Sequence, residues 1–176
     1  MKNSKRKNIN RGAMALSLLI VIMVGVGIYL HTYYFTVQAG PAQPIPFSHR
    51  LHVEKKDISC FFCHVGAIKG ARAGVPALET CMLCHRQVIT HHPEIVKLRE
   101  HYFQNEPIQW VKVEDVPDYA FFNHSVHVFR KVDCGECHGN IIQMDRVERV
   151  NEFNMGFCIE CHQEQEATTD CFTCHR

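Results

Sequence analysis

The stretch Cys60-Phe-Phe-Cys63-His64 contains the motif on which the whole chain is organised: two cysteines separated by two residues and followed directly by a histidine. The same Cys-x-x-Cys-His spacing recurs at Cys81–His85, Cys134–His138, Cys158–His162 and Cys171–His175. These five copies use all 10 cysteines of the 176-residue chain. No cysteine therefore remains for a disulfide.

This spacing is the attachment signal of c-type haem: the two thiols form thioethers to the vinyl groups, and the histidine becomes the proximal iron ligand. One Cys-x-x-Cys would equally fit a zinc site or a redox dithiol. Five copies with the histidine always in the same place favour haem. The sequence predicts five covalently bound haem c groups, with His64, His85, His138, His162 and His175 as metal ligands. The predicted cofactor-binding cysteines are Cys60, Cys63, Cys81, Cys84, Cys134, Cys137, Cys158, Cys161, Cys171 and Cys174.

The fold class follows from the ratio of chain to cofactor. Residues 40–176 provide 137 residues for five haems, too little side chain for an ordinary core around each macrocycle. We therefore expect a multihaem cytochrome c with little regular secondary structure, in which short α-helices surround the covalent haems. Pro93–Phe103 has the pattern of a connecting helix, with proline at its first position. Residues 107–120 are expected to be irregular with one short strand.

A membrane segment precedes this region. Gly12–Phe35 contains no Asp, Glu, Lys or Arg, and about 20 such residues cross the roughly 30 Å core of a bilayer. Tyr33, Tyr34 and Phe35 resemble an aromatic belt at its far end. Basic residues before the segment place the N-terminus inside and the rest on the periplasmic side of the cytoplasmic membrane, as a single-pass protein. These residues are Lys2, Lys5, Arg6, Lys7 and Arg11.

A cleavable signal peptide is the alternative to this anchor, although the apolar run is long for one. The basic tail, followed by an apolar segment, does not suggest nucleic-acid binding. The predicted organisation is a cytoplasmic tail (1–11), a transmembrane anchor (12–35), a stiff proline-rich linker (36–46) and a pentahaem domain (47–176).

The haem region contains an internal repeat. Phe47-Ser-His49-Arg-Leu-His52-Val53 precedes the first motif, and Phe122-Asn-His124-Ser-Val-His127-Val128 precedes the third. The order Phe-x-His-x-x-His, haem, haem thus occurs in residues 47–85 and 122–162, and the fifth haem follows at 171–175.

This pattern resembles the class III multihaem cytochromes c, in which the first histidine ligates the haem of the next motif and the second ligates another haem. The resemblance implies that His49 and His124 bind the haems of His64 and His138. His52 would then serve one of the other three haems, and His127 another. The alternative is that these four are surface histidines.

One haem still requires a sixth ligand. The candidates are His91, His92, His101, Met144 and Met155. The first three are adjacent to or within the predicted connecting helix, where solvent exposure or packing competes with ligation. Met155 has the character of a core residue. Met144 follows the third motif within range of a neighbouring haem, so we favour Met144.

Two further segments carry a closer resemblance: Pro107–His127 with Trp110, and the tract from Cys137 to His162. They resemble the pentahaem cytochrome c subunit (ActA) of alternative complex III. The resemblance implies a quinol-oxidising complex with an iron-sulfur subunit of molybdopterin-oxidoreductase-like fold, multi-span quinol-binding subunits and a monohaem cytochrome c. It also implies methionine ligation near Met144. The pair His91-His92 departs from the expected pattern.

The leading hypothesis is therefore a non-catalytic electron-transfer subunit that passes electrons from such a complex to a periplasmic acceptor. A stand-alone membrane quinol dehydrogenase of the small tetrahaem type is the alternative, and it would need an open haem at the lipid interface. A multihaem oxyanion reductase would need a five-coordinate haem and often a lysine-type motif. None of the five motifs departs from Cys-x-x-Cys-His.

Overall fold

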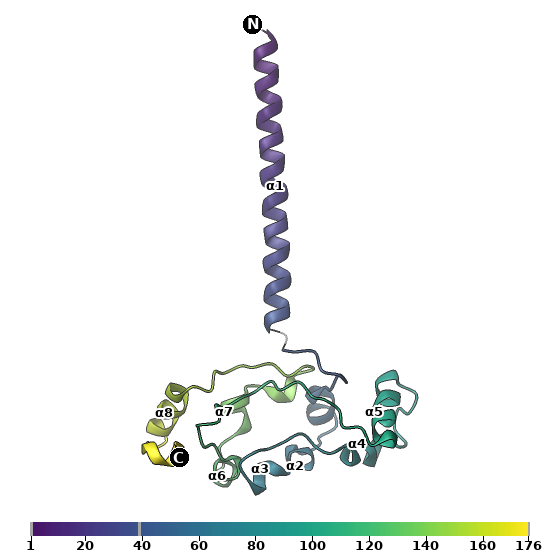
Figure 1. The fold of residues 1–176 in the computed structure, drawn as a ribbon, viewed down its shortest axis with the longest axis vertical. Coiled ribbons are helices and arrows are strands. Elements are labelled where there is room, and N and C mark those ends of the chain that lie inside the picture. Colours follow the sequence, from purple (N-terminus) through teal and green to yellow (C-terminus); the bar gives the residue numbers. More distant parts are fainter. Residues whose placement is uncertain (1, 39, 176) are drawn as a thin grey trace. The chain divides into compact units, whose positions relative to one another are not determined.

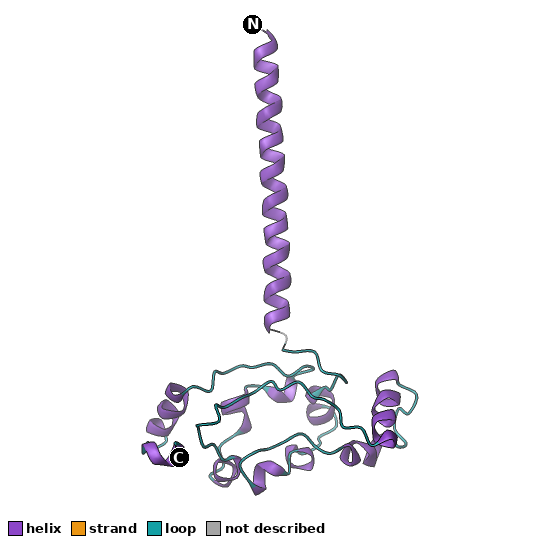
Figure 2. Ribbon diagram, in the orientation of Figure 1, coloured by secondary structure: helices purple, strands orange, loops and turns teal. Residues whose placement is uncertain are grey.

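The computed structural model describes residues 2–38 and 40–175, which belong to two compact units, residues 1–39 and 40–176. The described residues form helices, turns and loops, without a strand (Figure 2). The first unit is the single helix α1 (Lys2–Gln38), and the second carries the Cys-x-x-Cys-His motifs (Figure 1).

Helix α1 contains the apolar stretch Arg11–Tyr33, which is 23 residues long. At about 1.5 Å per residue this stretch exceeds the roughly 30 Å of a hydrocarbon core. Its polar side chains bond to their own helix, as lipid requires: Ser17 Oγ donates to the Met14 carbonyl (2.9 Å) and Thr32 Oγ1 to the Ile28 carbonyl (2.9 Å). By length and composition α1 can cross a membrane, a property that N-terminal signal sequences share.

The side chains of Tyr34, Phe35 and the basic residues before Arg11 lie outside the described residues. The aromatic belt and the charged tail therefore stay predictions.

Short helices in the second unit begin at or enclose the motifs, as the sequence predicts. Those with motifs are α2 (Cys60–Cys63), α4 (Leu78–His85), α7 (Cys134–His138), α8 (Met155–Glu164) and α9 (Cys171–Cys174). The others are the π-helix η1 (Arg50–Glu54), α3 (Gly66–Lys69), α5 (Pro93–Gln104), α6 (His124–Phe129) and the 3₁₀ turn η2 (Ile141–Gln143).

Side-chain caps fix where several motif helices start. A polar residue before the helix accepts a hydrogen bond from a backbone N–H of the first turn, which that turn cannot satisfy itself. Ser59 accepts from the N–H of residue 61 (3.3 Å), Asp133 from that of residue 135 (2.7 Å) and Asn154 from that of residue 157 (3.0 Å). In these three helices the cap fixes the start of the turn that carries the cysteine pair.

A small aliphatic core surrounds α5, whose start at Pro93 confirms the predicted connecting helix. Ile95 and Leu98 of α5 are buried together with Ile45 and Ile108. Each such side chain contributes roughly 1.5–3 kcal/mol of burial free energy. Ile45 belongs to the proline-rich segment that we expected to be a spacer, so part of that segment packs into the second unit.

The strand expected within residues 107–120 is absent from this described segment, and the prediction of a strand there was wrong. Its backbone finds a side-chain partner instead. Gln43 Nε2 donates to the Val111 carbonyl (2.9 Å), and the Val111 N–H donates to Gln43 Oε1 (2.9 Å). The amide group of Gln43 thus takes the place of a neighbouring strand.

The two repeats join where α3 packs against α6. The N–H groups of His124 and Ser125, at the start of α6, donate to the carbonyls of Ala71 (3.3 Å) and Gly70 (3.1 Å). The first turn of α6 is therefore satisfied by the chain that follows the first motif. Figure 1 shows α3 and α6 side by side.

Candidate haem sites

The predicted ligand histidines come together in pairs. Each pair combines the histidine of one motif with one histidine of a Phe-x-His-x-x-His segment. Ring centroids are separated by 6.3 Å in His49–His64, 6.2 Å in His52–His85, 6.4 Å in His124–His138 and 6.1 Å in His127–His162. The pairing of His49 and His124 is the one implied by the class III resemblance, and the partners of His52 and His127 are His85 and His162.

These separations fit two imidazoles on opposite sides of one iron. A metal–imidazole bond is about 2 Å long, so the two ligand nitrogens would lie about 4 Å apart. The distance from each ligand nitrogen to the centre of its own ring brings the separation of the two ring centroids to roughly 6 Å. The four pairs thus have the spacing that bis-histidine ligation requires.

Hydrogen bonds also give these histidines the tautomer that a haem ligand needs. In most of them Nδ1 lies against a backbone carbonyl, which can only accept, so Nδ1 carries the proton and Nε2 is free to bind iron. The acceptors are the carbonyls of Ser48 for His52 (2.8 Å), Gly74 for His64 (2.7 Å), Val88 for His85 (3.3 Å), Ala71 for His124 (2.8 Å), Asn123 for His127 (2.8 Å), Thr168 for His162 (2.5 Å) and Tyr119 for His175 (3.1 Å).

Burial keeps two further imidazoles neutral. The pKa of His49 is lowered to about 4, first by burial and then by the neighbouring His64 and His52. Burial, followed by His124 and His64, also lowers the pKa of His138. Both side chains are therefore uncharged at neutral pH, which is the form that binds a metal.

The phenylalanine that begins each repeat orients both of its histidines. One ring lies against the edge of the first imidazole and faces the second. The centroid distances are 5.0 and 4.4 Å from Phe47 to His49 and His52, and 4.7 and 4.6 Å from Phe122 to His124 and His127. This packing explains why the phenylalanine recurs with the histidines in the sequence.

The fifth motif has a different neighbour. The ring of Tyr119 lies 6.1 Å from that of His175, and the Tyr119 carbonyl accepts from His175 Nδ1. Met144, the predicted sixth ligand of the remaining iron, lies half-buried at the end of η2, where its carbonyl accepts from the Arg50 N–H (3.1 Å). The structure thus brings Met144 to η1 and Tyr119 to His175, and ligation by Met144 stays a prediction.

Two of the three competing histidines have structural roles around α5. His92 Nδ1 accepts from the N–H of Glu94 (3.3 Å) and caps the helix, which leaves the proton on Nε2. His101 Nδ1 donates to the Glu106 carbonyl (3.2 Å) in the last turn. His91 is exposed. The hydrogen bond of His92 fixes the tautomer opposite to that of the paired histidines.

The effect of one cysteine on the pKa of another shows which motifs lie close together. Burial, and then a cysteine of another motif, raises the pKa of several motif thiols. The pairs are Cys81 with Cys63, Cys134 with Cys60, Cys137 with Cys161, and Cys158 with Cys174. Motif two is therefore next to motif one, one next to three, three next to four, and four next to five.

The sequence analysis missed one side chain at these sites, the carboxylate of Asp145. Asp145 contacts the segment that carries His49 and His52, although it lies more than 90 residues away along the chain. One feature of the sequence could have indicated a polar contact here: a polar residue, Ser48 or Asn123, directly precedes the first histidine of each repeat. Both side chains accept a hydrogen bond from the turn that holds the ligands.

Two comparisons with known proteins bear on these sites. Residues 120–176 match the family described as cytochrome c7 and related cytochrome c. The chain is also 26% identical over 161 residues to the multihaem cytochrome c subunit of menaquinone reductase from Nitratidesulfovibrio vulgaris (strain Hildenborough), covering 76% of this chain and 77% of that protein. The family match includes the second Phe-x-His-x-x-His segment and the last three motifs.

Proposed function

We propose that this chain is a multihaem cytochrome c and the electron-transfer subunit of a membrane complex that reacts with quinones. The four histidine pairs carry the proposal, because their spacing suits six-coordinate iron with no place for a substrate. The relative's name, a subunit of menaquinone reductase, supports the connection to quinones.

The residues that would hold the haems follow from the sites. The 10 cysteines attach five haem c groups, and His64, His85, His138, His162 and His175 are the proximal ligands. His49, His52, His124 and His127 are the distal ligands of the first four, and Met144 is our proposal for the fifth. When bound, haem c supplies a reversible one-electron site.

The protein's own contribution is to fix these ligands. Each Nδ1–carbonyl hydrogen bond holds an imidazole in one orientation and makes it a better donor. Half-burial of the ligand histidines limits the access of water, which is one way in which a protein sets a haem potential.

We further propose that α1 anchors the chain in the cytoplasmic membrane with the haem unit on the periplasmic side. The fuller assignment is to a complex of the alternative complex III type, which oxidises quinol. Its other subunits would be an iron-sulfur protein with a molybdopterin-oxidoreductase-like fold, multi-span quinol-binding subunits and a monohaem cytochrome c. The apolar length of α1 and the five motifs support this assignment.

A second direction has its own support, because the relative is named for reducing menaquinone rather than for oxidising its quinol. The direction is tested on the complex isolated from membranes. Quinol should reduce the haems of the complex under anaerobic conditions, whereas the purified chain alone should stay oxidised. Haem reduction of the isolated chain by quinol would favour the stand-alone dehydrogenase. Quinone reduction by the complex with a reduced periplasmic donor, without the reverse reaction, would favour the relative's direction.

A further inference from the structure

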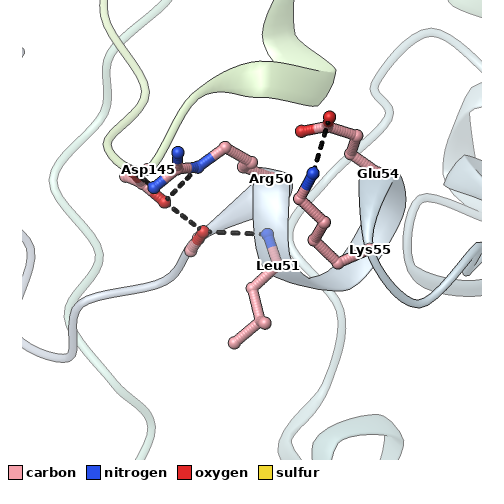
Figure 3. A network of polar contacts seen from close by, with 6 residues as sticks. Arg50, Leu51, Glu54, Lys55 and Asp145 are labelled. Atoms are coloured by element: carbon pink, nitrogen blue, oxygen red, sulfur yellow. Dashed lines mark hydrogen bonds and ion pairs between the residues drawn. The ribbon is translucent and has the colours of Figure 1, made fainter.

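A carboxylate from the second repeat lies against the distal-ligand turn of the first (Figure 3). Asp145 Oδ1 accepts from Arg50 Nε (3.2 Å) and from Ser48 Oγ (2.6 Å), and its other oxygen pairs with Arg50 Nη2. Ser48 Oγ in turn accepts from the Leu51 N–H (3.0 Å). The Met144 carbonyl adds a bond from the Arg50 N–H.

The residues bound by Asp145 lie between and beside the proposed ligands. Ser48 directly precedes His49, and Arg50 lies between His49 and His52. Their helix, η1, is a π-helix of only five residues, too short to be stable without tertiary contacts. The position of both imidazoles therefore depends on what holds η1 from outside.

In the second repeat, the turn that carries the distal ligands is held by residues of the same turn. Asn123, at the position of Ser48, accepts from both the N–H (3.0 Å) and the hydroxyl (2.8 Å) of Ser125, at the position of Arg50. Its turn, α6, is an ordinary α-helix that also packs on α3. Only the first repeat combines an arginine at this position with a distant carboxylate among the described residues.

We propose that Asp145 is a positioning residue that fixes His49 and His52 through Arg50 and Ser48, so that the chain after the third motif sets the ligand geometry of the first two haems. This inference rests on the proposed ligation by His49 and His52. Met144 and Asp145 then contribute to the first repeat through a backbone carbonyl and a carboxylate, whatever the Met144 sulfur binds.

The chemistry of the contact suits positioning better than stabilisation. An arginine fork on a carboxylate fixes direction as well as distance, which a lysine cannot do. The side chains of Arg50 and Asp145 are 51% and 56% exposed, so the ion pair itself adds little to folding stability. Its loss should change the orientation of the ligands more than the stability of the protein.

The test replaces Asp145 with Asn in the full-length protein carrying its haems. Asn keeps the shape but removes the charge and one of the acceptor oxygens. We expect the electron paramagnetic resonance g-values and midpoint potentials of two haems to shift, those of the other three to stay constant, and the unfolding midpoint to change little. Arg50→Lys should shift the same two haems.

Asp115→Asn is the matched control, because Asp115 is likewise an exposed carboxylate paired with a cation, Lys112, but contacts no ligand turn. It should shift no haem signal. His49→Ala and His52→Ala identify which signals belong to the first two haems.

Two results would overturn the inference: unchanged signals in Asp145→Asn, or equal shifts of all five haems, which would indicate general loosening. A high-spin haem in His49→Ala together with an unchanged Asp145→Asn spectrum would reject only the positioning role. A His49→Ala variant without any high-spin haem would instead reject the proposed ligation, and the positioning role with it.

Discussion

At the scale of single residues, a hydrogen bond separates one competing histidine, His92, from the paired histidines. Nδ1 of His64 and of His162 faces a carbonyl, whereas Nδ1 of His92 faces an N–H. The same side chain is therefore prepared as a ligand in the first two places and used as a helix cap in the third. Spacing in the sequence identified the motif histidines, but only backbone geometry separates the caps from the ligands.

Met144→His tests the ligand proposed for the fifth haem. Thioether ligation raises a haem potential relative to bis-histidine ligation, so the substitution should lower one midpoint potential and leave that haem low-spin. Redox titration followed by optical spectroscopy measures the shift. Met155→His is the control, since Met155 is 68% exposed at the start of α8 and should change no potential. An unchanged titration in Met144→His would remove Met144 from the ligand set.

Single residues also show which contacts can be predicted from the sequence and which cannot. The paired histidines are predictable because the segment Phe-x-His-x-x-His recurs shortly before the first motif of each repeat. The role of Asp145 was not predictable, because Asp145 and Arg50 are 95 residues apart in the sequence and their bond leaves no local pattern. Long-range polar partners of this kind are specified by the folded chain alone.

At the scale of secondary-structure elements, the turns that carry the proposed distal ligands set the angle between the two imidazoles of each pair. The first histidine of each turn is nearly parallel to its partner, with interplanar angles of 10° in His49–His64 and 2° in His124–His138. The second is rotated, by 66° in His52–His85 and 45° in His127–His162. Each repeat therefore builds one parallel and one rotated pair.

These angles predict two classes of signal in the oxidised protein. The orbital splitting of low-spin ferric haem depends on the angle between its imidazole planes. Electron paramagnetic resonance should show two haems with rhombic spectra, from the parallel pairs, and two with a larger maximum g-value, from the rotated pairs. His124→Ala should remove one rhombic signal and create a high-spin one. Four identical signals would contradict the observed angles.

The contact between α3 and the chain that follows it provides a stability prediction. A Cβ at Gly66 would lie 2.5 Å from the Arg72 carbonyl oxygen and 2.6 Å from that of Ala73, both of them backbone atoms. Gly66→Ala should therefore destabilise the protein by about 1–3 kcal/mol, as overpacking does. Thermal unfolding of the haem-loaded protein measures the change.

Gly70→Ala is the control for this prediction. No heavy atom lies within 4 Å of a Cβ placed at Gly70, which ends the same helix in an extended conformation. The unfolding midpoint of this variant should stay close to that of the unchanged protein. Equal effects of the two substitutions would show that the crowding at Gly66 is not the cause.

Element types were predictable where the chemistry is local. The helices at the motifs and α5 follow from caps and a first-turn proline. The strand expected within 107–120 failed because Gln43, far away in the sequence, satisfies the backbone of Val111. Likewise, the burial of Ile45 within the proline-rich segment could not be read from composition, because it depends on the hydrophobic face of α5.

At the scale of the haem unit, the order of the motifs in space differs from their order in the chain. The effects of neighbouring cysteines on one another's pKa give the order two, one, three, four and five. The packing of α3 on α6 produces this order, because it brings the first motif of one repeat against the first ligand turn of the next. Motifs two and five are thus the ends of the series, and motif three is its centre.

The central place of motif three in this series leads to a testable prediction. A variant without the third haem, Cys134→Ala with Cys137→Ala, should divide the remaining four haems into two separated pairs. Quinol added to the complex should then reduce only two haems rapidly, as followed by stopped-flow absorbance. Removal of the fifth haem, by Cys171→Ala with Cys174→Ala, leaves an unbroken series of four haems. These four haems should be reduced as one group. If electrons enter at this end, the reduction of all four should instead be slowed to the same extent. Rapid reduction of all four haems in the variant without the third would show that the motifs are not connected in this series.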